Sequence, residues 1–474
     1  MRLILIILFA ILVTTAVVII IDDTRDAGGK AAWLLIIAIL PVIGSVLFFL
    51  FGFNNRHHAI FNRRHRKYLE TFEAGADPRL RQLLFGEDAE GEVREAYRPL
   101  VRLLKGWYGP GVSKGNSVEV ITSGQRKFDL LCEDIKSAKE YIHLEYFRFS
   151  NDASGRAIRD LLVQKAAEGV KVRFLHENVA NYAVPSKYYN DMAKAGVEVV
   201  RFSGPRYHLI RIITRLNYRN HRKIVVIDGR VGYTGGMNVN DHYVKQWRDT
   251  HLRIEGDAVA SLQYIFMDSW LTAGGTIDRP FMDYFPSVGV KGSIPMQVTP
   301  DEPDAEWAIL QMGHIWAIQH ARDYIWLQTP YFVPPEPLLE ALKSAALSGV
   351  DVRLMVPVKS DTPLMGPANR SFFKECLEAG IKIYERSEPF MHCKTFVSDD
   401  YLSSVGSANL DYRSLQINYE DTAFIYDEAT ALRCKEIFLS DQALSREVTM
   451  EILSSIPRIK RFWSKIVRLF SPML

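Results

Sequence analysis

The chain carries a short motif whose residue types suit phosphate chemistry. In "MHCKTFVSDD", residues 391–400, His392, Lys394 and Asp399 follow the pattern H-x-K-x4-D. An imidazole can act as a nucleophile or as an acid and base, and an ammonium group can stabilise charge on a phosphate oxygen. A single short match could equally be three polar residues at the end of a strand. The motif therefore needs support from the rest of the chain.

A second copy of the motif supplies this support. The stretch "HRKIVVID" begins at His221 and places Lys223 and Asp228 at the same spacing. Further polar residues follow the two histidines in register, and these are Asn238 with Asn409 and Asp249 with Glu420. Five recurring positions in otherwise divergent segments exclude chance as the explanation.

The sequence around the motifs is also repeated. Three pairs of segments align: 138–147 with 321–332, 169–175 with 349–355, and 194–202 with 378–386. The pairs combine a helix that ends at glycine with a short β-branched strand, as in βα units. This alternation predicts an α/β fold, in which helices cover the faces of a mixed or parallel sheet.

The residue types match what an exchange of alcohols on a phosphodiester needs. One imidazole can attack phosphorus, while the other protonates the leaving alkoxide and then deprotonates the incoming alcohol. We expect Lys223 and Lys394 to bind the nonbridging oxygens, with Asn238 and Asn409 as neutral phosphate-binding donors. Two ammonium groups supply the positive field and the sequence offers no carboxylate cluster, so we expect no metal and no cofactor. The spacing does not say which histidine attacks.

The motif aspartates have a different expected role. We expect Asp228 and Asp399 to hold backbone or lysine geometry and not to touch phosphate. Their loss should still abolish activity.

Both motifs, each followed by G-G/S-x-N, are similar to those of the phospholipase D superfamily over about residues 116–445. Two N-terminal apolar runs, "HLEYF", "QTPYF" and the ending "LFSPML" resemble the bacterial cardiolipin synthases within it. The resemblance implies two tandem phospholipase D-like α/β/α sandwich domains related by a pseudo-twofold axis. One active site would lie at their junction.

The resemblance also implies roles for individual residues. His221 would be the nucleophile and His392 the general acid and base. Asp249 and Glu420 would each hold the far ring nitrogen of a histidine and so set its tautomer. Asp249 is one methylene shorter than glutamate, which makes this role less secure in the first half.

Two apolar runs, 3–21 and 31–53, are long enough to cross a bilayer as helices. A cleaved signal peptide is the alternative for the first run, but its length and lack of an A-x-A site disfavour it. Basic residues cluster at 56–67, whereas the loop at 22–30 carries three aspartates, so we expect both ends of the hairpin in the cytoplasm.

The expected domains are two transmembrane helices (1–53), a juxtamembrane connector (54–115), a first phospholipase D-like domain (116–290), and a second one with a C-terminal basic amphipathic segment (291–474).

Two further stretches are amphipathic and basic. In 207–220 an apolar stripe runs beside three arginines, Arg211, Arg215 and Arg219, a pattern typical of a helix at an anionic membrane surface. An ordinary surface helix packed on the sheet is the alternative. The segment 457–470 either lies on the membrane or packs on the body.

The resemblance, together with the expected anchor, implies a cardiolipin synthase of the cell (inner) membrane, with two spans and a cytoplasmic catalytic domain. It would transfer a phosphatidyl group between two phosphatidylglycerol molecules. The alternatives are a hydrolytic phospholipase D, a phosphatidyltransferase that uses another donor or acceptor, a nucleic-acid phosphodiesterase and a scaffold without activity. The expected partners are phosphatidylglycerol, cardiolipin and the membrane. A net charge of +3 does not point to nucleic acid, and the sequence leaves oligomerisation open.

Overall fold

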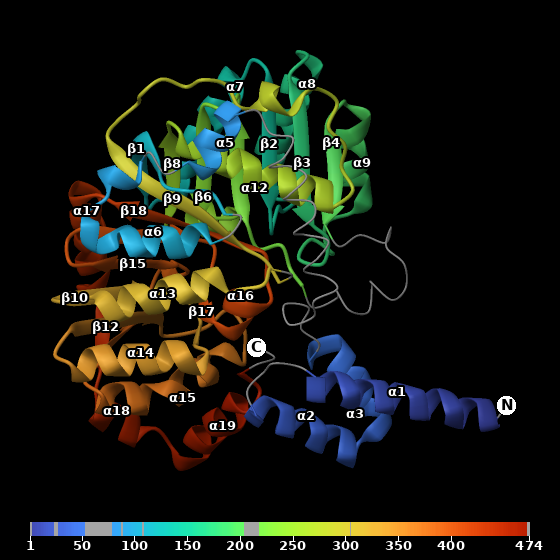
Figure 1. Cartoon of the computed structure of the whole chain (residues 1–474), viewed down its shortest axis with the longest axis vertical. Coiled ribbons are helices and arrows are strands. Elements are labelled where there is room, and N and C mark those ends of the chain that lie inside the picture. The colour runs from blue at the N-terminus through green and yellow to red at the C-terminus, as the bar shows by residue number, and fades with distance from the viewer. Residues whose placement is uncertain are drawn as a thin grey trace.

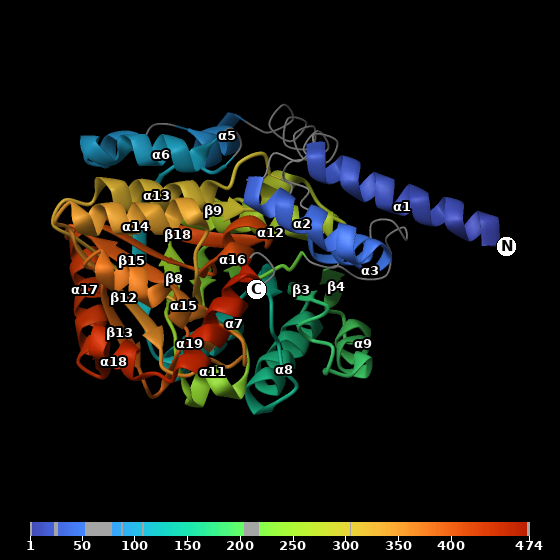
Figure 2. The same ribbon diagram turned by 90° about the horizontal axis from the view of Figure 1, so that it is seen from below.

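The computed structural model describes residues 2–22, 27–52, 78–86, 89–106, 109–202, 218–303 and 305–471. Its body consists of two halves with similar elements, the first coloured teal to yellow-green and the second gold to red (Figure 1). A group of N-terminal helices projects from the body in this view and in Figure 2.

The N-terminal helices cover both apolar runs of the sequence. They are α1 (Arg2–Asp22), α2 (Ala27–Ile39), α3 (Pro41–Leu47) and a π-helical turn, η1 (Phe48–Gly52). A small cluster that includes Ala16, Trp33 and Phe48 holds them together, whereas Ile4, Ile11 and other large apolar side chains are exposed. Among the described residues, no helix has both the length and the apolarity that a membrane span needs. The two-span anchor remains a prediction, and the basic cluster at 56–67 lies outside the described residues.

The first half begins earlier than its expected start at residue 116. Its strands and helices are β1 (Ser113–Ile121), α7 (Gly124–Ser137), β2 (Tyr141–Tyr146), α8 (Ala153–Ala167), β3 (Lys171–Glu177), α9 (Ser186–Lys194), β4 (Glu198–Phe202), β5 (Lys223–Ile227), β6 (Val231–Gly235), α11 (Asp241–Lys245), β7 (Trp247–Arg248), β8 (His251–Glu255), α12 (Ala258–Thr272) and η5 (Phe281–Tyr284). Side chains cap the starts of α7 and α8, where Ser123 and Asp152 accept hydrogen bonds from backbone N–H groups.

The second half repeats this order. Its elements are β9 (Ile294–Asp301), α13 (Ile309–His320), β10 (Tyr324–Gln328), β11 (Phe332–Val333), α14 (Glu336–Leu347), β12 (Asp351–Pro357), α15 (Met365–Glu378), β13 (Lys382–Arg386), β14 (Phe390–Met391), β15 (Thr395–Ser398), β16 (Leu402–Gly406), β17 (Leu410–Asp411), α16 (Tyr412–Gln416), β18 (Glu420–Tyr426), α17 (Glu428–Gln442), β19 (Ser445–Val448), α18 (Met450–Ser455) and α19 (Arg458–Arg468).

One continuous sheet of 15 strands joins the halves, in the order β19-β13-β12-β10-β15-β16-β18-β9-β1-β8-β6-β5-β2-β3-β4. Read outward from the centre, β1-β8-β6-β5-β2-β3-β4 matches β9-β18-β16-β15-β10-β12-β13 strand for strand. The central strands β1 and β9 pair antiparallel, as a local twofold requires. This pairing also covers the edge that each half would otherwise expose.

Helices cover both faces of the sheet in each half. In the first half, α12 packs on one face and α7, α8 and α9 pack on the other. In the second half, α17 takes the place of α12, and α13, α14 and α15 replace the other three. Figure 2 shows helices on either side of the strands. The result is the expected α/β layering, with one shared sheet in place of two separate sandwiches.

Short helices from the expected connector also pack on the body. In α5 (Pro78–Phe85), Leu80 and Leu84 join the first-half core beneath α12. In α6 (Arg98–Lys105), Leu100 and Leu104 join the second-half core beside α13. Between them lie the 3-10 turns η3 (Glu90–Glu92) and η4 (Glu95–Tyr97). The described part of this segment therefore belongs to the folded body.

Candidate active site

Both motif histidines line one cavity between the two halves. The cavity has a volume of about 480 Å³, and Asn238, Asn409 and Arg219 also line it. The histidines are largely buried, with exposed fractions of 8% for His221 and 5% for His392. The structure thus brings together the two motifs that the sequence places far apart. A cavity of this size can hold a lipid headgroup.

Backbone contacts between the halves position each histidine. The N–H of His221 donates to the carbonyl of Tyr419 (2.9 Å), and the N–H of His392 donates to the carbonyl of Arg248 (2.8 Å). The second contact continues the short parallel pair formed by β7 and β14. Each histidine therefore lies just before a strand of its own half and is hydrogen-bonded to a backbone segment of the other half.

The orienting carboxylates are exchanged between the halves. The Nδ1 atom of His221 lies 2.9 Å from Oε2 of Glu420, and Nδ1 of His392 lies 2.9 Å from Oδ2 of Asp249. Both carboxylates are almost fully buried. A proton on Nδ1 that is donated to the carboxylate leaves Nε2 as the reactive nitrogen. Each histidine is therefore oriented by the half that does not carry it.

The first half has Gly236 where the second half has Ser407, and this difference has a physical explanation. A Cβ atom on Gly236 would lie 2.1 Å from Oδ1 of Asp249, so a side chain there would collide with the carboxylate. At the equivalent position of the second half, the hydroxyl of Ser407 donates to Oε2 of Glu420 (2.5 Å). Asn418 donates to the other oxygen of Glu420 (3.1 Å). The second-half carboxylate is thus held by neighbouring side chains.

The motif aspartates form turns away from the histidines. Asp228 accepts hydrogen bonds from the backbone N–H groups of residues 139–141, each at 2.8 Å. Asp399 accepts the equivalent three from residues 322–324, at 2.9–3.0 Å. Both have a left-handed backbone, with φ of 50° and 51°, a conformation that aspartate adopts more readily than most residues. They join the turn after the motif strand to the start of β2 or β10.

The two motif lysines are buried beside the histidines. The ammonium groups of Lys223 and Lys394 each donate to the backbone carbonyl of the histidine two positions earlier, both at 2.5 Å. Burial lowers the pKa of Lys223 to about 7, and the positive charge of Lys394 adds to this effect. Burial also lowers the pKa of Lys394. Removing two neighbouring cations from water is unfavourable unless an anion joins them, so the pair is suited to a phosphate group.

Both histidines are neutral in the free protein near pH 7. Burial lowers the pKa of His221 to about 4, with Lys223 adding to the effect and Glu420 opposing it. Burial and the charge of Lys394 lower the pKa of His392 to about 4. A neutral imidazole has the lone pair that a nucleophile needs, and an arriving phosphate anion would favour protonation of the second ring.

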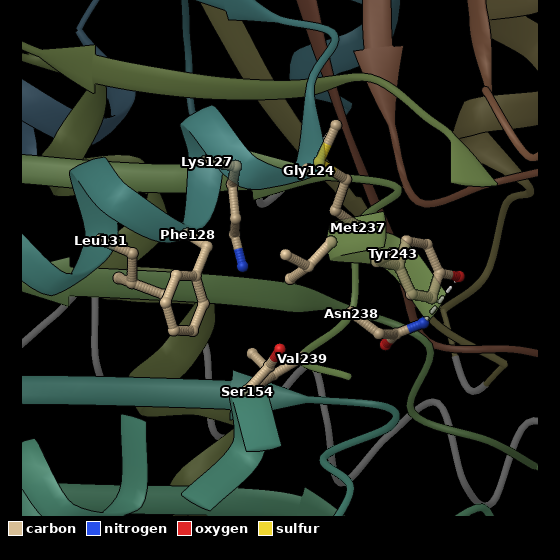
Figure 3. A pocket seen from close by; sticks show the side chains of 10 residues that line it. Gly124, Lys127, Phe128, Leu131, Ser154, Met237, Asn238, Val239 and Tyr243 are labelled. Carbon is tan, nitrogen blue, oxygen red and sulfur yellow. Dashed lines mark hydrogen bonds between the residues drawn. The ribbon is translucent and has the colours of Figure 1, made fainter. Parts of the chain in front are cut away.

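Asn238 is fixed by a hydrogen bond to a neighbouring tyrosine and by one from the backbone. Its Oδ1 accepts from the N–H of Arg148 (3.0 Å), and its Nδ2 donates to the hydroxyl of Tyr243 (3.0 Å). The same two side chains line a smaller pocket, which the side chain of Lys127 enters (Figure 3). That pocket has a volume of only about 10 Å³, which is too small for a headgroup. Of these two cavities, only the larger one can hold a headgroup. Asn409 donates to Asp411 and Ser414.

Only one of the three arginines expected at the lipid headgroup can be placed. Arg219 lines the cavity and is half-buried. Its pKa is lowered by burial, while Glu177 opposes the effect. Arg211 and Arg215 lie outside the described residues, as does most of the expected helix at 207–220.

Comparisons with known proteins identify the family of the chain. The family described as "Cardiolipin synthase, PLD-like domain" matches residues 131–270 and 315–442, one segment in each half. The chain belongs to this family of phospholipase D-like proteins. A second family, described as "Phospholipase_D-nuclease N-terminal", matches residues 4–52.

Curated relatives of this phospholipase D-like chain are similar over nearly its whole length. The major cardiolipin synthase ClsA of Bacillus subtilis (strain 168) is 38% identical over 460 residues, which cover 94% of this chain and 93% of that protein. The cardiolipin synthase of Listeria monocytogenes serotype 4a (strain HCC23) is 37% identical over 452 residues, with 94% and 93% covered. A crystal structure of phosphatidylserine synthase from Haemophilus influenzae Rd KW20 has a TM-score of 0.57 at 15% identity, covering 75% of this chain and 95% of that one. That likeness supports the fold alone.

The sequence reasoning missed two residues at this phospholipase D-like site. The hydroxyl of Tyr243 lies 3.1 Å from Nδ1 of His392. Arg222, the variable residue of the first motif, is fully buried and binds the carbonyl of Glu420 (3.1 Å) and the carboxylate of Glu302 (2.9 Å). Aligning the two halves beyond the motifs would have drawn attention to Tyr243. It lies 22 positions after His221, where the second half has Ser414 at the same distance from His392, so the two halves differ at this position.

The lysine pKa predicts a pH dependence for catalysis. The ammonium form of Lys223 is complete well below pH 7 and is lost as the pH rises through about 7. We expect kcat/KM to fall above neutrality, because this parameter reports ionisations of the free enzyme. Lys223→Arg should be slower but should move this fall to higher pH, since a guanidinium stays charged. The measurement is kcat/KM on phosphatidylglycerol vesicles across the neutral range.

A second buried lysine provides the control for this prediction. Lys127 also has a pKa lowered by burial to about 7, but its ammonium group donates to the hydroxyl of Tyr146 and lies in the smaller pocket. Lys127→Met should leave the fall of kcat/KM above neutrality at the same pH. If the fall of kcat/KM moved to another pH in Lys127→Met and not in Lys223→Arg, the ionisation of Lys223 would not be its cause.

Proposed function

We propose that this chain is a cardiolipin synthase, which converts two phosphatidylglycerol molecules to cardiolipin and glycerol through a phosphatidyl-histidine intermediate. The observation that carries the proposal is the pair of imidazoles in one cavity, each oriented by a carboxylate of the opposite half. Relatives that bear the name cardiolipin synthase and are similar along nearly the whole chain support the choice of lipid.

The first half-reaction forms the intermediate. Nε2 of His221 attacks phosphorus of the first phosphatidylglycerol, and the bond from phosphorus to the glycerol oxygen breaks. His392, protonated in the substrate complex, gives its proton to the departing oxygen, so glycerol leaves as a neutral alcohol. Lys223 and Lys394 stabilise the charge on the nonbridging oxygens, and Glu420 stabilises the positive charge that develops on His221.

The second half-reaction releases the product. A terminal hydroxyl of the second phosphatidylglycerol gives its proton to His392, and its oxygen attacks phosphorus. The bond from phosphorus to nitrogen then breaks, which restores neutral His221 and yields cardiolipin. The two steps are the same displacement in opposite directions, so the reaction is reversible and needs no external energy source.

The proposal includes a membrane anchor with the catalytic body on the cytoplasmic side. The match of residues 4–52 to the N-terminal family supports an anchoring role for this segment. The exposed apolar side chains of α1 support it as well, since Ile4 and Ile11 have exposed fractions of 62% and 57%. In α19, exposed Ile459, Phe462 and Trp463 lie among basic residues, a pattern suited to an anionic bilayer surface. Val467 and Arg468 attach this helix to the body.

Product analysis tests the proposed function. Purified full-length protein is incubated with vesicles of phosphatidylglycerol alone, and the lipids are separated by thin-layer chromatography. We expect cardiolipin and free glycerol in equal amounts. Phosphatidic acid as the sole lipid product would show that water is the acceptor and would replace the synthase proposal with a hydrolytic phospholipase D.

A further inference from the structure

The two walls of the cavity differ, although the pseudo-twofold axis relates them. Two positions before the motif histidines, the first half has an arginine and the second half a phenylalanine. Two positions before the orienting carboxylates, the order is reversed, with a tryptophan in the first half and an asparagine in the second. Because the carboxylates are exchanged, His221 is flanked by Arg219 and Asn418, and His392 by Phe390 and Trp247. At these positions the duplication has therefore produced a polar pair beside His221, whose ring also contacts Phe147 (centroids 4.7 Å apart), and an aromatic pair beside His392.

Ring contacts define the aromatic wall around His392. The centroid of the imidazole lies 5.2 Å from that of Trp247, 6.1 Å from Phe390 and 6.1 Å from Tyr331. Trp247 and Phe390 also contact each other, with centroids 4.9 Å apart. Aromatic faces of this kind attract the C–H groups of a polyol or a cation, and they offer nothing to a phosphate.

A carboxylate completes this wall. Asp361 lies in the loop between β12 and α15 and lines the same cavity as His392. The hydroxyl of Tyr331 donates to Oδ1 of Asp361 at 2.5 Å, which fixes the carboxylate in the wall. A negative charge repels phosphate, so Asp361 is not a phosphate ligand. Its free lone pairs can accept hydrogen bonds from hydroxyl groups of a neutral ligand.

We propose that the wall formed by Trp247, Tyr331 and Asp361, with Phe390 packed against Trp247, is an alcohol subsite that binds the glycerol headgroup. This inference rests on the proposed function and names the part of the site that selects the alcohol. Asp361 accepts a hydrogen bond from the hydroxyl on the carbon next to the one that carries the reacting oxygen, and the rings of Trp247 and Tyr331 contact the C–H groups of the glycerol. His392 contacts the reacting oxygen itself.

One subsite of this kind serves both half-reactions. The departing glycerol has a hydroxyl on the carbon next to the one that carries its reacting oxygen, and so does the glycerol headgroup of the accepting lipid. The same contact with Asp361 therefore positions the leaving alcohol for protonation and the incoming alcohol for attack. Water lacks the neighbouring hydroxyl and gains nothing from the subsite, which favours transfer over hydrolysis.

A competition between soluble alcohols tests the subsite. Full-length enzyme is incubated with cardiolipin vesicles and equal concentrations of isotopically labelled glycerol and 1,3-propanediol, which lacks the middle hydroxyl. Mass spectrometry gives the ratio of labelled phosphatidylglycerol to phosphatidylpropanediol. We expect the wild type to prefer glycerol by at least about tenfold, the size expected for one hydrogen bond to a charged group. Asp361→Asn and Asp361→Ala should bring the ratio to within about twofold of unity.

Matched variants separate this effect from loss of charge or folding. Glu378→Gln removes an exposed carboxylate of α15 that does not line the cavity, and it should keep the wild-type ratio. Tyr331→Phe removes the hydrogen bond to Asp361 and should lower the ratio without affecting the core, because Tyr331 is only partly buried. A wild type that does not distinguish the two alcohols would overturn the inference whether or not the Asp361 variants fold.

The remaining outcomes distinguish the two levels of the proposal. An unchanged preference in the Asp361 variants, with normal total transfer, would overturn the alcohol subsite and leave the synthase function standing. Phosphatidic acid as the only product of the wild type would overturn both. A third arm with ethanolamine tests whether the wall selects a cation, and a preference for ethanolamine over glycerol would overturn the glycerol subsite.

Discussion

His221→Ala should reduce cardiolipin formation at least about 10⁴-fold and abolish the covalent intermediate, because it removes the nitrogen that bonds to phosphorus. His392→Ala should reduce turnover by a similar factor, about 10⁴-fold, because neither the leaving nor the incoming oxygen can then exchange its proton. The rate of cardiolipin formation on phosphatidylglycerol vesicles checks both losses. His320→Ala removes an exposed histidine outside the cavity and should retain wild-type activity.

A donor with a p-nitrophenol headgroup separates the roles of the two histidines. Its phenolate leaves without a proton, so His392→Ala should still release about one equivalent of p-nitrophenolate in a burst. The phosphatidyl group should then remain attached to His221, where mass spectrometry of peptides can locate it. His221→Ala should show no burst. A burst in His221→Ala and none in His392→Ala would mean that His392 is the nucleophile.

The duplication was predictable because it rests on local signals. Each H-x-K-x4-D motif contains a short apolar strand, and each glycine-terminated helix precedes another strand, so the order of the elements follows from the sequence. The strand-by-strand match of the two halves in the sheet agrees with this register. The α/β fold and the family were therefore accessible without coordinates, whereas the single continuous sheet was not. It depends on the pairing of β1 with β9, for which neither strand carries a distinctive pattern.

Contacts across the halves were not predictable, because the segments that make them carry no distinctive sequence pattern. The exchange of carboxylates depends on the two-residue strands β7 and β14, which are too short to give any periodic pattern. Asp361 lies in an irregular loop, and nothing in the sequence places that loop beside a histidine of a later strand. Tyr243 was missed because an aromatic residue on a short helix usually packs in a core. Residues that act through long-range contacts need the coordinates to be recognised.

Glu420→Gln should reduce transfer about 10²- to 10⁴-fold, the range expected when an orienting carboxylate becomes an amide. Burial alone would raise the pKa of Glu420, but His221 and Lys223 lower it, so the carboxylate is charged in the folded protein. An amide in its place cannot balance the positive charge that develops on His221 during attack. The loss should appear in the burst from the p-nitrophenol donor, which reports the attack alone.

Asp249→Asn provides the matched comparison, because Asp249 holds the other histidine. It should reduce cardiolipin formation by a similar factor, about 10²- to 10⁴-fold, yet keep the burst, since His392 has no proton to supply in that step. Glu428→Gln removes an exposed carboxylate and should behave as the wild type. If Asp249→Asn lost the burst and Glu420→Gln kept it, each carboxylate would serve the histidine of its own half. The opposite pattern follows only when the two halves complete each other's histidines, so that neither half contains a working nucleophile by itself.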